Sequence, residues 1–170
     1  HGFVERGGGL VLFPGPQADL SYYNRQLLPG LLAATLVEVT GAPGGTELHG
    51  RLDLTGPRHP ILSGLATDDP PALRALFRLT PSRPLAPLLQ TTDGRLVAAE
   101  GWLRPGRVTL FAVPLDLAWS DLPLDGRFAP LMHRLARRSV LPPGHGQTYT
   151  VGDLVRRHVP GVTAEDALQV

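Results

Sequence analysis

The sequence predicts an α/β fold with a mainly parallel sheet, and three observations favour it. Glycines 7–9 end what resembles the last turn of a helix, and the apolar run 10–13 follows at once. A strand that is apolar on both faces is typical of a central strand in a parallel sheet covered by helices. Residues 86–113 read as strands between tight turns, and residues 127–140 carry apolar side chains at helical spacing.

Two elements are expected between the first strand and residue 54. Asp19 or Ser21 can cap a short helix, because a side-chain oxygen at that position accepts from free backbone N–H groups. The apolar segment 27–36 is expected to continue this helix. Residues 47–54 alternate between apolar and polar side chains, which predicts a strand.

The middle of the chain gives weaker signals and then the clearest ones. Residues 59–62 are expected to form a loop that turns an Ile-Leu pair inward, and residues 71–77 a short helix with proline in its first turn. Three strands then form an antiparallel meander or a hairpin that returns to the main sheet, with Asp-Gly and Pro-Gly at the turns. These strands are residues 86–90, 96–102 and 108–113.

The chain is expected to divide at residue 141. Residues 1–141 would form the α/β domain, truncated at its N-terminus because the chain opens without methionine as if within a helix. Residues 142–170 would form a linker and the start of a following β domain, with a candidate strand at 147–151.

Composition excludes several classes of function. The net charge is +1 over 170 residues, so no nucleic-acid partner is expected. There is no cysteine, which removes thiolate catalysis and cysteine-based metal sites. No apolar run approaches the roughly 20 residues that span a bilayer. No histidine pair has metal-ligand spacing and no glycine loop has the order of a phosphate site, so no metal or cofactor is expected.

The loop after the last strand carries the best candidate binding residues. They are Asp116, Trp119, Ser120 and Asp121, which follow a strand end where α/β proteins place ligands. Asp116 and Asp121 are part of a spaced acidic set, although the spacing matches no calcium loop. A serine hydrolase that pairs Ser120 with His133 is a further alternative, but Ser120 lies outside the G-x-S-x-G frame.

Four stretches together resemble one known family. They are FVERGGGLVLFPG (residues 3–15), YNRQLLP (23–29), GRVTLFAVPLDLAWSDLPL (106–124) and FAPLMHRL (128–135). In order and spacing they resemble the class I glutamine amidotransferase-like domain of aerotolerance-type (BatA-like) bacterial membrane proteins. The resemblance covers residues 3–140 and implies a flavodoxin-like three-layer sandwich.

The resemblance also implies a setting for the chain. It implies a membrane-anchored parent protein, an extracytoplasmic location, and partners among other domains of the same chain, including a von Willebrand A domain. An amidotransferase of this class needs a cysteine nucleophile, which the chain lacks. We therefore expect a non-catalytic domain that acts in assembly or protein–protein interaction. The alternatives are a small-molecule or cation-binding module at residues 116–124 and a serine-type hydrolase.

Overall fold

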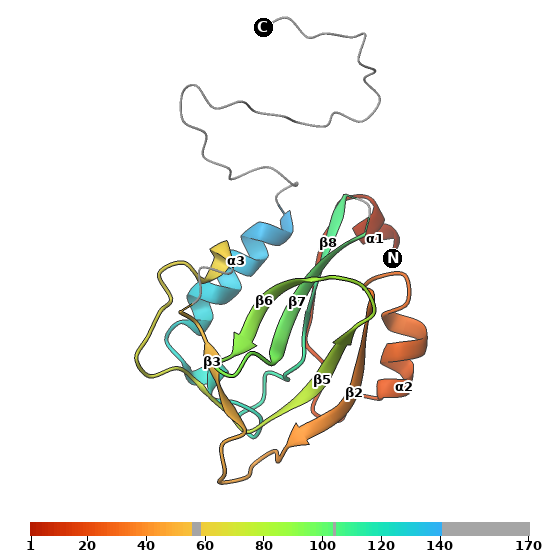
Figure 1. Ribbon diagram of the computed structural model, residues 1–170. Coiled ribbons are helices and arrows are strands. Elements are labelled where there is room, and N and C mark those ends of the chain that lie inside the picture. The colour runs from red at the N-terminus through yellow and green to blue at the C-terminus, as the bar shows by residue number, and fades with distance from the viewer. Residues whose placement is uncertain (56–58, 104, 141–170) are drawn as a thin grey trace, which may run out of the picture.

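The computed structural model describes residues 1–55, 59–103 and 105–140, arranged as Figure 1 shows. The helical elements are α1 (Gly2–Glu5), α2 (Leu20–Tyr22), the π-type turn η1 (Tyr23–Leu27), the 3-10 turns η2 (Pro60–Leu62) and η3 (Leu122–Leu124), and α3 (Phe128–Val140). The strands are β1 (Gly9–Leu12), β2 (Ala34–Gly41), β3 (Gly50–Asp53), β4 (Ala72–Leu73), β5 (Ala75–Pro81), β6 (Ala86–Thr91), β7 (Leu96–Leu103) and β8 (Gly106–Phe111).

The strands form a mixed sheet and a separate ribbon. Within the described residues, six strands pair in the order β1-β8-β7-β6-β3-β4, and β2 pairs with β5 alone. β1 and β8 are parallel, and the other neighbours are antiparallel. The sheet curls strongly into a half-barrel (Figure 1). The predicted mainly parallel, flavodoxin-like or amidotransferase-like three-layer sandwich is therefore wrong, because four of the five strand pairings described in this sheet are antiparallel. The tight turns of the β6–β7–β8 meander require antiparallel neighbours.

Different layers pack on the two faces of this sheet. Side chains alternate along a strand, so consecutive residues of β7 point to opposite faces of the sheet. Glu100 pairs with Arg138 of α3, whereas a Cβ on Gly101 would lie 2.4 Å from Leu32, in the turn that leads into β2. Figure 1 shows α3 on one side of the sheet and the β2–β5 ribbon on the other. Fully buried side chains on the strands include Leu52, Val97, Leu110 and Phe111.

Two predicted helices are strands or turns in the structure. The segment 27–36 leaves the helical conformation after η1 and enters β2 at Ala34. The segment 71–77 forms β4 and the start of β5. Ala75, Leu76 and Phe77 are consecutive and all buried, so the period-two alternation that identifies a strand is absent. A short continuous apolar run of this kind cannot be told from a buried helix by its pattern.

Several other predicted elements are confirmed. The meander is present as β6, β7 and β8, and the C-terminal amphipathic helix as α3. Gly7 has a φ of 99°, which suits its place after α1. The apolar run 10–13 overlaps β1, but within the described residues β1 pairs with β8 alone, at the edge of the sheet, and it is only partly buried. The expectation that it lies centrally in the sheet is therefore wrong.

A side chain, rather than a strand, occupies part of the outer edge of β2. Asn24 of η1 donates from Nδ2 to the carbonyl oxygen of Leu36 at 2.6 Å, and its Oδ1 accepts from the Leu36 N–H at 2.9 Å. Both main-chain groups of Leu36 therefore point away from β5. This fits a non-hydrogen-bonded position opposite Leu79 in the antiparallel ladder.

The expectations for residues 142–170 lie outside the described residues. In the part of the chain that the structure describes, no helix is long and apolar enough to cross a membrane.

Candidate functional site

The predicted binding loop is a folded turn packed onto β4 and β5. Asp116 Oδ1 accepts from the N–H of Ala118 at 2.7 Å. Trp119 is 2% exposed and its ring lies 4.8 Å from that of Phe77, centroid to centroid. Asp121 pairs with Arg74 at 2.7 Å. The tryptophan therefore fills the core, and one carboxylate is neutralised by an arginine.

The alternatives for this loop fare differently. Among the described residues, no group of three or more His, Cys, Asp or Glu side chains could hold a metal ion. Ser120 is 0% exposed and its hydroxyl has no hydrogen-bond partner in the described part of the chain. His133 is exposed on α3, and no hydrogen bond joins it to Ser120. Ligand binding by residues 116–124 stays a prediction.

A cleft that the sequence did not indicate lies between the ribbon and the β6–β7 hairpin. Its volume is about 380 Å³, at the lower end of the roughly 300–1,000 Å³ of small-molecule sites. Its lining comes from four separate parts of the chain: Thr40 on β2, His49 before β3, Leu76, Arg78 and Leu79 on β5, and Arg95 and Leu96 where β7 begins. Apolar and polar side chains therefore share one concave surface.

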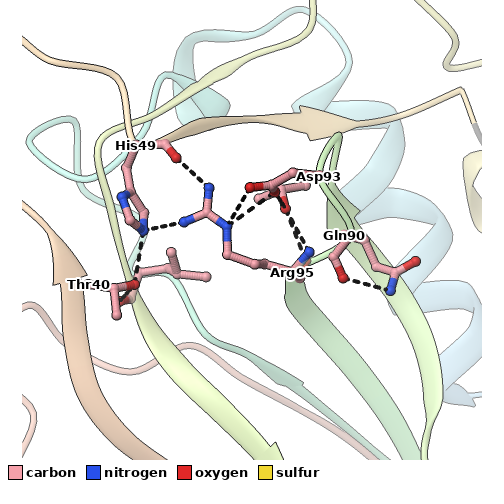
Figure 2. A network of polar contacts seen from close by, with 8 residues as sticks. Thr40, His49, Gln90, Asp93 and Arg95 are labelled. Atoms are coloured by element: carbon pink, nitrogen blue, oxygen red, sulfur yellow. Dashed lines mark hydrogen bonds and ion pairs between the residues drawn. The ribbon is translucent and has the colours of Figure 1, made fainter.

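Arg95 organises the polar side of the cleft. Figure 2 shows its guanidinium between His49 and Asp93. It donates to the His49 carbonyl oxygen from Nη2 and contacts His49 Nε2 through Nη1. Its Nε donates to Asp93 Oδ1 at 3.1 Å. We call His49, Asp93 and Arg95 the cleft cluster.

The Arg95 contact determines the tautomer of His49. A guanidinium can only donate hydrogen bonds, so the Nε2 atom that it contacts must be the accepting, unprotonated nitrogen. Burial and then the positive charge of Arg95 lower the pKa of His49 from 6.5, and Asp93 opposes them. His49 is therefore neutral at pH 7, with its proton on Nδ1. The Thr40 hydroxyl lies 3.1 Å from the same Nε2.

Asp93 holds Arg95 within the turn. The Thr91 hydroxyl donates to Asp93 Oδ1, and Thr91 Oγ1 accepts from the Arg95 N–H at 2.8 Å. Hydrogen bonds from Thr91 first, and then from Arg95, lower the pKa of Asp93 to about 2. Gly94 completes the turn with a φ of 88°, a conformation that glycine adopts without strain. The sequence identified this Asp-Gly turn but not the arginine after it.

The second arginine of the cleft is held less firmly. Arg78 pairs with Glu38 at 2.9 Å, and the two side chains are 56% and 61% exposed. Neither Glu38 nor Asp93 lines the cleft. Among its described lining residues, the charged side chains are therefore both cationic.

Another arginine network lies under α3, and we call Glu100, Arg107 and Arg138 the helix cluster. Glu100 is 2% exposed and accepts from Arg138 Nε and Nη2 at 3.1 and 3.0 Å. Arg107 Nε lies 3.4 Å from Glu100, and its Nη1 donates to the Arg138 carbonyl oxygen at 3.1 Å. The Arg107 guanidinium also stacks 4.4 Å from the Trp102 ring centroid. These contacts join α3 to β7 and β8.

A wider hollow of about 640 Å³ has a described lining of Thr55, His59, Pro60, Leu62, Ser63, Gly64 and Ala66. The titratable residue among these is His59, which precedes η2. Its Nδ1 accepts a hydrogen bond from the Ile61 N–H at 3.3 Å. Since its lining comes from one local segment, this hollow gathers no side chains from different elements.

Comparison with known proteins gives similarity in fold alone. No family model matches the chain, and no curated protein matches it by sequence. Among solved structures it is similar to the cytoplasmic proteins STM3548 and STM1381 from Salmonella typhimurium, at 16% and 18% identity with TM-scores of 0.66 and 0.65. Each similarity covers 81% of this chain but 57% and 58% of the other. A β-galactosidase from Rahnella sp. R3 is similar over 19% of its length, with 15% identity and a TM-score of 0.56.

These similarities correct the family resemblance. The similar structures are cytoplasmic proteins and a part of a glycosidase, and the curled, mixed sheet is not the fold that the resemblance implied. The resemblance to the amidotransferase-like domain of BatA-like membrane proteins is therefore wrong. The membrane-anchored parent and the extracytoplasmic location that it implied lose their support.

Proposed function

We propose that this domain binds a small molecule in the cleft between the β2–β5 ribbon and the β6–β7 hairpin. One observation carries the proposal: segments that are distant in sequence bring three leucines together with Arg95 and His49 in the lining of one concave surface. A ligand site needs this combination, because apolar contact provides affinity and a few fixed polar groups provide orientation.

The chemistry of the cleft favours binding over catalysis. Thr40 and His49 lie at the distance of a nucleophile and its general base, 3.1 Å. Arg95 donates to the same His49 nitrogen that would have to accept the proton. A lone pair that already accepts from a guanidinium is a poor base, so the pair supports orientation of a ligand rather than attack on it.

The test is a cleft-filling substitution with a matched control. Leu96 and Leu103 are half-buried leucines at opposite ends of β7, and only Leu96 lines the cleft. We expect fragments found by NMR screening of the wild type to bind Leu96→Trp at least about tenfold more weakly, because the indole occupies their volume. Leu103→Trp should bind them like the wild type. Fragments that bind both variants equally, or a screen without any binder, would contradict the proposal.

A protein-binding role stays a second proposal. It is favoured by Leu115, Leu117 and Leu124, which are all exposed on the segment after β8. Replacing all three with serine should reduce any self-association of the wild type in sedimentation velocity. Association that persists in the triple variant would count against this surface.

A further inference from the structure

We infer that the ligand of the cleft is a free hydrophobic monocarboxylate, bound through Arg78 after this arginine releases Glu38. The inference rests on the proposed function, and it adds the chemical class of the ligand and the residue that selects it. Three features of the cleft lead to it: the sign of its charges, the unequal restraint of its two arginines, and its apolar wall.

The charges that face the cleft have one sign. Arg78 and Arg95 line it, whereas Glu38 and Asp93, their carboxylate partners, do not. His49 adds no charge at neutral pH, because burial and Arg95 lower its pKa. An anionic group that enters the cleft therefore meets cations without facing a carboxylate on the described lining. This arrangement favours an anion over a neutral or cationic ligand.

The two arginines are not equally free to bind this anion. Arg95 has contacts at Nε, Nη1 and Nη2 and is 32% exposed, so it is fixed in place. In the described part of the chain, Arg78 has one ion pair, with a carboxylate that is itself exposed. Such exposed pairs contribute little, since water competes for both charges. A ligand carboxylate that approaches from the cleft can thus replace Glu38 as the partner of Arg78. Arg95 keeps its position and its contacts.

The size and wall of the cleft define the rest of the ligand. Leu76, Leu79 and Leu96 provide apolar contact. A volume of about 380 Å³ lies near the lower end of the roughly 300–1,000 Å³ of small-molecule sites. This suits an aromatic or short aliphatic acid rather than a peptide. One releasable arginine also matches the single charge of a carboxylate better than the double charge of a phosphate monoester.

The experiment compares acids with their uncharged amides. Phenylacetate and octanoate are titrated by isothermal calorimetry and NMR, beside phenylacetamide and octanamide, which have nearly the same shape. We expect each acid to bind about tenfold more tightly than its amide, the difference made by a charge-assisted hydrogen bond. Chemical-shift changes should centre on the amides of Leu79, Arg95 and Leu96.

Substitutions assign the difference to one arginine. Arg78→Gln should bring acid and amide within about twofold of each other, because the ion pair is lost. Glu38→Gln should tighten binding of the acids and leave the amides unchanged, because the competing carboxylate is gone. Arg51→Gln is the matched control: Arg51 is an exposed arginine paired with exposed Asp69 at 3.0 Å, and it does not line the cleft. It should bind both probe classes like the wild type.

The outcomes separate this inference from the proposed function. Amides that bind as tightly as acids, in the cleft, would overturn the carboxylate and leave small-molecule binding intact. Acids that bind equally well to Arg78→Gln would overturn the role of Arg78. If neither class binds and the broader fragment screen also finds no binder, small-molecule binding itself fails.

Discussion

The helix cluster and the cleft cluster both join arginine to carboxylate, but they differ in how far they are enclosed. In the helix cluster, Glu100 is 2% exposed and two arginines converge on it beneath α3. In the cleft cluster, Asp93 is 59% exposed and Arg95 borders a cavity. The first cluster joins elements to each other, and the second holds an arginine in place beside open space.

This difference shows that enclosure, rather than residue type, separates a structural arginine from one available to a ligand. Arg107 has one face on Trp102 and its Nη1 on a helix carbonyl, so nothing can approach it without moving α3. Arg78 has an exposed partner and a cavity beside it. Each of these two arginines forms an ion pair with a glutamate, so the pairing alone does not distinguish them.

The largest expected effect is the loss of the buried carboxylate. Glu100→Gln leaves two arginines without their shared counter-charge. We expect the free energy of unfolding to fall by about 3–5 kcal/mol, as for other broken buried pairs. Urea denaturation followed by circular dichroism measures this change. Glu38→Gln is the exposed control, with an expected change within about 0.5 kcal/mol. Similar losses in both variants would show that enclosure does not decide how much an ion pair contributes to stability.

A smaller effect is expected on the pH dependence of stability. Burial, and then Arg138, lower the pKa of His59 from 6.5, with Glu100 opposing and Arg107 adding to the shift. As the pH falls through 6.5, the unfolded chain therefore binds a proton that the folded chain does not, and stability decreases from pH 7 to pH 5. His59→Asn keeps an acceptor for the Ile61 N–H and should flatten this slope in urea titrations. A slope that stays unchanged in His59→Asn would show that the burial of this ring has no consequence for stability.

The smallest expected effect concerns Asp93 at acid pH. Its folded-state pKa of about 2 lies below the ordinary 3.8, so the stability that it contributes is present above pH 4 and is lost as the pH falls towards 2. Asp93→Asn should reduce the steepness of acid unfolding over this range, followed by the fluorescence of buried Trp119. Acid unfolding of equal steepness in both proteins would show that the turn does not depend on the Asp93 charge.

The parts of the fold that the sequence predicted are those with local signals. The Asp-Gly turn and α3 each depend on residues close in the chain, and both are present. The ribbon could not be predicted in this way, because β5 is buried on both sides over Ala75–Phe77 and pairs with β2, about forty residues earlier. β5 is a strand because it pairs with β2, and its own sequence pattern does not indicate a strand.

The candidate site was hidden for the same physical reason. Arg95 and His49 lie 46 residues apart in the chain, and their contact exists only after β3 and the hairpin come together. Of the four residues that the sequence favoured, Trp119 and Ser120 follow a strand end but fill the core. Aromatic and hydroxyl residues at a strand end indicate a ligand site only if the surrounding segments leave room there.

Asn24 has a consequence for how this protein behaves when it is concentrated or stored. Its carboxamide offers Leu36 the same donor and acceptor as a neighbouring strand. A second copy therefore cannot extend the ribbon at this point, which removes one starting place for fibre-like aggregation. Slow hydrolysis of that amide to a carboxylate would remove the donor and set a negative charge against the Leu36 carbonyl. The protection of this edge of the ribbon thus depends on the carboxamide of one side chain that does not line the cleft.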